Sequence, residues 1–122
     1  MLALISTDIE HQKTIIVLLL SLIANWEKEL QKHCLNYQHE SILDQKTASK
    51  LRPKKSNGNI FFISLAVLCR TFKNNKDCEL FCYQWHRIVL DEGHCICNSK
   101  TISHKACCAV KAQCHWIITG KN

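Results

Sequence analysis

Four short, mostly apolar runs constrain the fold of this chain more than any other sequence feature. They are rich in β-branched and aromatic residues, and they are TIIVL (14–18), IFFIS (60–64), RIVL (87–90) and HWIIT (115–119). A strand that is apolar at successive positions has both faces covered, as in a parallel sheet, whereas a strand with one wet face alternates. The runs therefore predict strands that lie inside a layered structure.

Segments with helical periodicity separate these runs. Residues 21–33 carry Leu22, Ile23, Trp26 and Leu30 at helical spacing, and Ser21 is the candidate N-cap. Residues 65–72 and 101–112 are the other helix candidates, the last with Ile102, Ala106, Ala109 and Val110 on one side. The alternation of strand and helix predicts an α/β fold, with a mostly parallel sheet and helices on its faces. A chain of 122 residues allows one such domain.

A polar, basic stretch, 44–58, interrupts the alternation and ends near Asn-Gly. It predicts a surface connection with about one helical turn, on which five basic side chains are exposed: Lys46, Lys50, Arg52, Lys54 and Lys55. The formal net charge of the chain is +6. Such an excess fits a polyanionic partner, and it fits plain solubility equally well.

Nine cysteines in 122 residues leave three interpretations open. A disulfide framework is disfavoured by the odd number. A zinc site is weakly indicated, because no pair shows the C-x-x-C spacing that zinc ribbons favour. Reduced, buried cysteines without a special role are the preferred interpretation.

The apolar run from Thr14 to Ala24 raises the question of a membrane span or a signal peptide. It is about half as long as a transmembrane helix requires. Asp8 and Glu10 precede it, which does not suit the positive start of a signal peptide. A buried strand followed by a helix explains the run better, and no membrane association is expected.

Two carboxylates follow the third strand directly, in the sequence Asp91-Glu92-Gly93-His94. In open α/β folds, ligands bind at the carboxyl edge of the sheet. An aspartate at that edge can hold a magnesium ion on nucleotide phosphates, and an adjacent glutamate can orient or deprotonate an attacking water. Taken alone, however, the same four residues fit a solvated acidic turn.

Several motifs in a fixed order add a family resemblance. WHRIVLDEGHCICNSKT, followed by AVKAQCHWIITG, resembles the DEGH motif and the linking motif of Swi/Snf-type helicase-like ATPases. The branch it resembles most contains the helicase-like transcription factor and its DNA-repair relatives. TIIVLLLSLIANWEKELQKHC and NIFFISLAVL resemble two further segments of that family, so the likeness covers about residues 14–120.

The resemblance implies a RecA-like motor lobe that uses ATP and magnesium and acts on double-stranded DNA in the nucleus. By position, Asp91 would help to hold magnesium, and Glu92 would be the catalytic base. His94 would couple the nucleotide state to a second lobe, and Thr119 and Gly120 would link the ATP and DNA sites. Ser21 and Asn25 lie in the segment that approaches the DNA backbone in this family. The three tryptophans, Trp26, Trp85 and Trp116, are interpreted as packing residues.

The sequence also departs from the family. It contains no G-x-G-K-T phosphate loop, whose backbone amides and lysine hold the nucleotide phosphates. We therefore interpret 1–122 as a partial first lobe that begins after this loop and ends at the linking motif, without the central phosphate-loop strand and without the second lobe. Cysteine or histidine replaces family arginines at Cys97, Cys114 and His115, which suggests a decaying copy.

Three hypotheses follow. The first is a motor-lobe fragment of an ATP-dependent DNA translocase that acts in DNA repair or chromatin remodelling. Alone, this fragment is expected to be inactive, because it retains the carboxylates but lacks the phosphate-binding loop. Were it to hydrolyse ATP, another basic group, such as Lys13 or Lys121, would have to hold the phosphates. The second is a non-catalytic module that binds DNA or a partner protein. The third and least favoured is a cysteine-rich zinc or secreted protein.

Overall fold

A computed structural model describes residues 13–33, 38–56, 58–91 and 100–118 of the chain. Its centre is a sheet of five parallel strands in the order β2-β3-β1-β4-β5. The strands are β1 (Thr14–Leu18), β2 (His39–Ile42), β3 (Ile60–Ser64), β4 (Trp85–Asp91) and β5 (Ala112–Ile118). The predicted α/β class with a parallel sheet is confirmed.

The three inner strands are almost completely buried. Every residue of β1 and β3 is buried, and so are all residues of β4 except His86 and Asp91. The register sets Val17 of β1 beside Ile63 of β3 on one side and Leu90 of β4 on the other. Apolar side chains therefore cover both faces of the sheet centre, as the continuous apolar runs predict.

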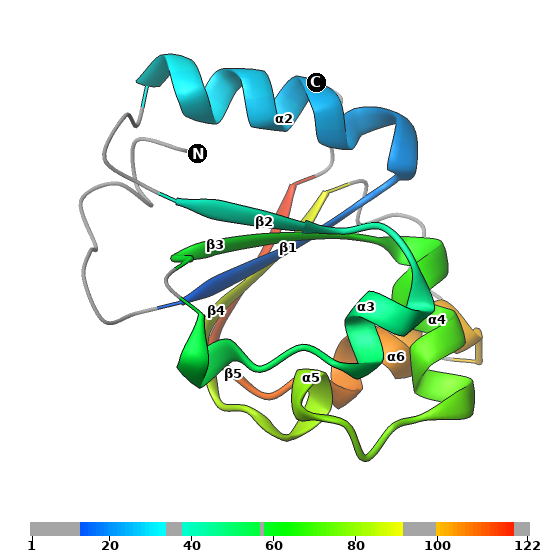
Figure 1. Cartoon of the computed structure of the whole chain (residues 1–122). Coiled ribbons are helices and arrows are strands. Elements are labelled where there is room, and N and C mark those ends of the chain that lie inside the picture. The colour runs from blue at the N-terminus through cyan, green and yellow to red at the C-terminus, as the bar shows by residue number, and fades with distance from the viewer. Residues whose placement is uncertain (1–12, 34–37, 57, 92–99, 119–122) are drawn as a thin grey trace.

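Helices form a layer on each face of this sheet (Figure 1). One layer is α2 (Leu20–His33). The other consists of α3 (Gln45–Ser49), α4 (Leu65–Asn74), α5 (Glu79–Cys82) and α6 (Ile102–Ala109), with the short 3-10 turn η1 (Pro53–Lys55) before β3. Each connection runs from the carboxyl end of one parallel strand to the amino end of the next, which is why the helices cross over the sheet.

The two layers enclose two separate cores. The core under α2 contains Ile16, Phe62 and Val89 from the sheet, together with Ile23 and Leu30 from the helix. The larger core on the opposite face includes Phe61, Trp85, Leu68 and Ala106. Each large side chain that is fully buried here stabilises the fold by about 1.5–3 kcal/mol relative to exposure.

Several predicted boundaries are corrected by the structure. α2 begins at Leu20, so Ser21 lies within its first turn and is not the N-cap. α6 ends at Ala109 instead of near residue 112, and β5 already starts at Ala112 instead of His115. Strand β2 and helix α5 were not predicted, because β2 is polar and α5 has only four residues. Among the described residues, no helix is long and apolar enough to cross a membrane.

The described cysteines are all free. Two are buried (Cys78 and Cys107), two are half-buried (Cys69 and Cys114) and two are exposed (Cys82 and Cys108). Within the same ranges, no three histidine, cysteine or acidic side chains come together as a metal site would need. The preferred interpretation also expected the cysteines to be buried, and this holds for only two of the six described ones.

Candidate functional site

The carboxyl edge of the sheet is the candidate site, and Asp91 is its described acidic group. Asp91 is the last residue of β4, where it lies half-exposed beside Ile118, the last residue of β5. Because the strands are parallel, Ser64 at the end of β3 and Leu18 at the end of β1 reach the same edge. A buried apolar strand thus delivers a carboxylate to the edge at which open α/β folds bind ligands.

The other predicted catalytic and nucleotide-binding residues lie outside the described ranges. These are Glu92 and His94, directly after β4, and Thr119 and Gly120, directly after β5. The strands that lead to them are adjacent and end in register. Of the predicted catalytic and nucleotide-binding residues, the structure therefore describes Asp91 alone.

The predicted DNA-contacting residues Ser21 and Asn25 lie on α2. Both side chains are exposed. They are four residues apart in one helix, so they share one face of it. Since Ser21 belongs to the first turn of α2, this face begins at the carboxyl end of β1, at the same edge of the sheet as Asp91.

Lys13 lies at the opposite, amino edge of the sheet. It immediately precedes β1, and its Nζ donates to the carbonyl oxygens of Ser56 at 3.1 Å and of Gly58 at 2.6 Å. Partial burial lowers the pKa of Lys13, while the nearby Glu40 carboxylate acts in the opposite direction. The suggestion that Lys13 could hold phosphates next to Asp91 is therefore wrong, because Lys13 lies at the other edge of the sheet. Its ammonium group instead links the start of β1 to the segment before β3.

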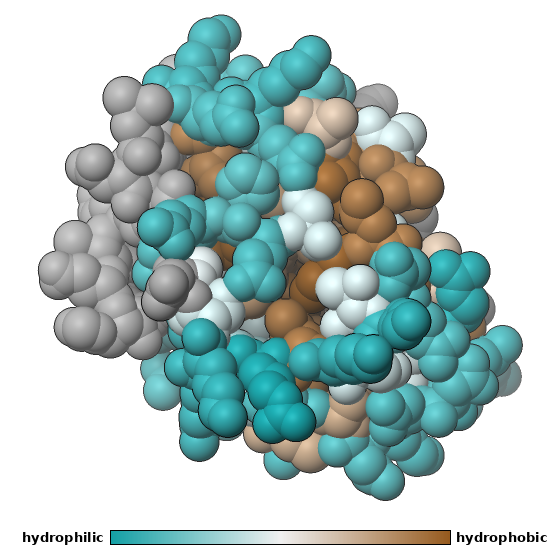
Figure 2. Space-filling view, in the orientation of Figure 1, coloured by the Kyte–Doolittle hydropathy of each residue, from teal (hydrophilic) through white to brown (hydrophobic). Residues whose placement is uncertain are grey.

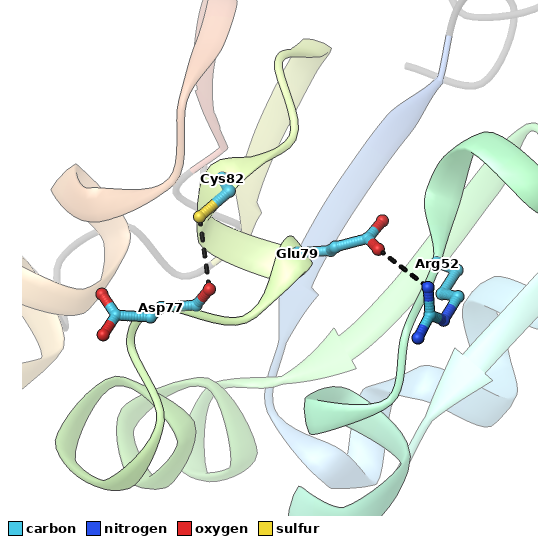
Figure 3. Close-up of polar contacts among 4 residues, drawn as sticks. All are labelled: Arg52, Asp77, Glu79 and Cys82. Atoms are coloured by element: carbon cyan, nitrogen blue, oxygen red, sulfur yellow. Dashed lines mark hydrogen bonds and ion pairs between the residues drawn. The ribbon is translucent and has the colours of Figure 1, made fainter.

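The basic connection between β2 and β3 has the predicted exposure. All five of its basic side chains are exposed: Lys46, Lys50, Arg52, Lys54 and Lys55. Arg52 forms an ion pair with Glu79 of α5, with 3.5 Å between Nη1 and Oε2 (Figure 3). Because the connection runs from the carboxyl end of β2 to the amino end of β3, its lysines are spread from one edge of the sheet to the other.

The basic connection and the predicted DNA-contacting face lie on different sides of the sheet. α3 and η1 belong to the layer opposite α2 (Figure 1). In the space-filling view, hydrophilic side chains cover the outside of both layers, and hydrophobic ones show in a band between them (Figure 2). The structure does not bring the five basic side chains together with Asp91, Ser21 and Asn25 into one site.

Two contacts between distant segments were not predicted from the sequence, and both lie toward the amino ends of the strands. The guanidinium carbon of Arg87 lies 4.4 Å from the ring centroid of Trp116, which joins β4 to β5 below Asp91. On α2, Glu27 accepts a hydrogen bond from Ser41 and lies 3.4 Å from His39 Nε2, which joins the helix to β2. Both depend on strand pairing between distant segments, and no local sequence pattern indicates them.

The fold and the position of Asp91 define an open parallel α/β domain with a carboxylate at its ligand-binding edge. The family model described as "SNF2-related domain" matches residues 1–121. The chain therefore belongs to the SNF2-related family, and the resemblance to Swi/Snf-type ATPases is confirmed.

Relatives and solved structures agree with this assignment. A "Probable global transactivator" of Orgyia pseudotsugata multicapsid polyhedrosis virus is 35% identical over 115 residues, 91% of this chain and 22% of that protein. The "DNA repair protein rad8" of Schizosaccharomyces pombe is 31% identical over 94% of this chain and 11% of its own length. The "Sulfolobus solfataricus SWI2/SNF2 ATPase core in complex with dsDNA" matches 98% of this chain and 24% of that chain, with 25% identity and a TM-score of 0.75. The chain thus spans less than a quarter of each of these proteins.

Proposed function

We propose that this chain is part of the first motor lobe of an ATP-dependent DNA translocase of the Swi/Snf type. The observation that carries the proposal is Asp91 at the carboxyl end of buried β4, beside the end of β5, in a chain of the SNF2-related family. In this family role, the edge binds ATP, and the complete protein converts hydrolysis into movement along double-stranded DNA. The repair proteins among its relatives support a nuclear role in repair or chromatin remodelling.

The donor set at the edge fits magnesium bound together with a nucleotide. Magnesium prefers oxygen ligands and keeps several waters, so one or two carboxylates and phosphate oxygens suffice to hold it. Asp91 supplies a half-exposed carboxylate at the required edge. When bound, magnesium would neutralise the charge on the phosphates.

The residues next to Asp91 have separate proposed roles. Glu92 would accept the proton of the attacking water, and His94 would connect the nucleotide site to the second lobe. Thr119 and Gly120, which follow β5, would connect the ATP site to the DNA site. Ser21 and Asn25 would contact the DNA backbone from the exposed face of α2.

Alone, the chain should bind nucleotide weakly and should not turn it over. These 122 residues contain no G-x-G-K-T phosphate loop. Lys13 lies at the amino edge of the sheet and already binds two carbonyl oxygens. The carboxylates would remain, but the phosphates would lack a preorganised set of donors.

Paramagnetic NMR with manganese–ATP can locate even weak binding. We expect line broadening for amides at the carboxyl edge, such as Leu90, Ser64 and Ile118, and little for Gly58 at the amino edge. D91N should remove the effect. The matched control is D77N, since Asp77 is an exposed aspartate in a loop. Broadening centred on the amino edge, or broadening that is unchanged in D91N, would refute the proposed site.

A non-catalytic binding module is the second candidate, and the exposed basic connection favours it. Five basic side chains lie exposed between β2 and β3, so a polyanion can approach them. Binding that rests on them should be weak, insensitive to sequence and steeply dependent on salt, because it depends on counterion release. Fluorescence anisotropy with duplex DNA measures this, comparing the chain with K54Q/K55Q and with S21A/N25A. Tight binding that persists at high salt would contradict this interpretation.

A further inference from the structure

The charged side chains of the described residues are divided unevenly between the two helical layers. In α2, Lys28 and Lys32 are balanced by Glu27 and Glu29, so this layer carries no formal net charge. The opposite layer with its connections, which we call the basic face, exposes eleven Lys and Arg side chains and contains three acidic residues. Besides the five basic residues between β2 and β3, the basic face includes Arg70, Lys73, Lys76, Lys100, Lys105 and Lys111. The positive charge of the described chain therefore lies on one side of the sheet.

Side-chain contacts join the helices of the basic face into a continuous surface. Asn74 of α4 donates from Nδ2 to Oε1 of Gln45 in α3 at 3.2 Å. On the other side of α4, the Sγ atom of Cys69 lies 3.6 Å from Oγ of Ser103 in α6. The cations that α3, α4 and α6 expose therefore belong to one surface and not to three separate ones.

The basic face also contains an aromatic ring that is only partly buried. Phe72 of α4 packs edge-on against Phe81 of α5, with 5.9 Å between ring centroids. The Nζ atom of Lys76 lies 5.6 Å from the centroid of the Phe72 ring, and Lys73 is exposed on the same helix. A cation beside a partly exposed ring suits a partner that offers a carboxylate next to an apolar side chain.

Three carboxylates within the basic face favour a polypeptide partner over duplex DNA. Asp44 and Asp77 are exposed, and Glu79 is half-buried and paired with Arg52 at 3.5 Å (Figure 3). A duplex presents phosphates at regular spacing, so these carboxylates would repel it wherever it crosses them. A flexible acidic segment can instead direct its carboxylates to the lysines and its apolar side chains past the acidic positions.

We propose that the basic face binds an acidic polypeptide segment of a partner protein, with apolar side chains between its carboxylates. The carboxylates of this segment pair with exposed lysines such as Lys73 and Lys76, and an apolar side chain covers the open part of Phe72. Charge complementarity directs the partner to this layer, because the charges of α2 cancel. This interaction is separate from the ATP and DNA roles proposed above, which concern the carboxyl edge of the sheet and α2.

Fluorescence anisotropy with short labelled peptides tests the proposal on the full chain. The probe alternates glutamate pairs with single leucines, and the comparison peptide is polyglutamate of equal charge. At near-physiological salt, the leucine-containing peptide should bind about tenfold more tightly, because its leucines bury apolar surface against Phe72. K73Q/K76Q should weaken its binding about fivefold, since each exposed ion pair contributes little by itself. K28Q/K32Q removes the same charge from α2 and should leave the affinity unchanged.

NMR chemical-shift mapping locates the bound peptide. We expect shifts at amides of α3, α4 and α6, and none along the exposed side of α2. Equal binding of polyglutamate, equal losses in the two double variants, or shifts centred on α2 would overturn the proposal. Displacement of the probe by short duplex DNA of equal total charge would overturn it as well, because the basic face would then be a DNA-binding surface.

Discussion

The inner and outer strands of the sheet differ in how much of the fold depends on them. β1 and β3 are buried at every position, and β4 is buried at five of its seven. On the outside, β5 alternates between half-buried and exposed residues, and in β2 only Ile42 is buried. The inner strands carry the core of both layers, whereas the outer strands are held mainly by backbone pairing and a few side-chain contacts.

This difference separates stability from the candidate site. Asp91 ends an inner strand, so its position is fixed by the best-packed part of the molecule. Its neighbour β5, which leads to Thr119 and Gly120, lies at the margin of the sheet. Substitutions in the inner strands should therefore destabilise the whole domain. Substitutions in β5 should mainly weaken the pairing of β5 with β4 beside Asp91.

Trp85→Ala should have the largest effect. Trp85 is fully buried, packs edge-on against Phe61 with 5.2 Å between ring centroids, and donates from Nε1 to the carbonyl oxygen of Leu80 at 3.0 Å. We expect a loss of about 3–5 kcal/mol in the free energy of unfolding, as for other buried aromatics. Urea denaturation measures it, and a loss below that of W116A would contradict the inner–outer distinction.

Trp116→Ala should cost about 2 kcal/mol, roughly half as much as Trp85→Ala, because the ring of Trp116 is only partly buried. Part of this cost comes from the lost contact between the ring and the Arg87 guanidinium. The expected loss is measured by urea denaturation, and hydrogen exchange should show faster opening of β5 than of β1. I117T is the matched control on the same strand. Since Ile117 is 59% exposed, its replacement should change stability by about 0.5 kcal/mol or less.

Ser64→Ala tests the junction between β3 and α4. Ser64 is buried and caps α4, with its Oγ accepting from the backbone amide of Val67 at 3.2 Å. Loss of this cap should cost about 1–2 kcal/mol. Thermal or urea unfolding checks it, and unchanged stability would show that the α4 amides find another acceptor.

Asp44 caps α3 on the outside of the molecule and should have a smaller effect that depends on pH. The backbone amide of Thr47 donates to Asp44 and lowers the pKa of its carboxyl below the ordinary value of 3.8. A lowered folded-state pKa stabilises the fold above the ordinary value, and this contribution disappears as the pH falls through the folded pKa. The stability difference between the wild type and D44N should therefore vanish on acidification below about pH 4, and a difference that grows there would contradict the assignment.

Sequence patterns predict the inner strands, but they do not predict the elements and boundaries that are set by pairing between strands distant in the sequence. β1 and β3 start and end where predicted, because continuous apolar runs can only be covered on both faces. β2 is not predicted from the sequence, because HESI contains no apolar run. It forms a strand because His39–Ile42 pairs with β3. The boundary between α6 and β5 was misplaced because Ala112–Cys114 has no clear preference, and pairing of Ala112 with Trp85 decides it.

For the candidate site, the sequence placed Asp91 correctly at the end of a strand. It could not show that Lys13 lies at the opposite edge, because that follows from its bonds to Ser56 and Gly58, 43 and 45 residues away. The contact of Arg87 with Trp116 likewise depends on the pairing of β4 with β5. The roles of Glu92, His94, Thr119 and Gly120 remain predictions.

Steady-state ATP hydrolysis by the purified chain, with magnesium and duplex DNA, tests the central claim most directly. In the proposed role, Asp91 and Glu92 would supply only the carboxylate part of the machinery, and an arginine finger alone is worth roughly 10³–10⁵ in rate. The account predicts no turnover above background for the chain, and none for its E92Q control. Turnover by the chain that E92Q abolishes would contradict it, and a basic group other than Lys13, such as Lys121, would then have to hold the phosphates.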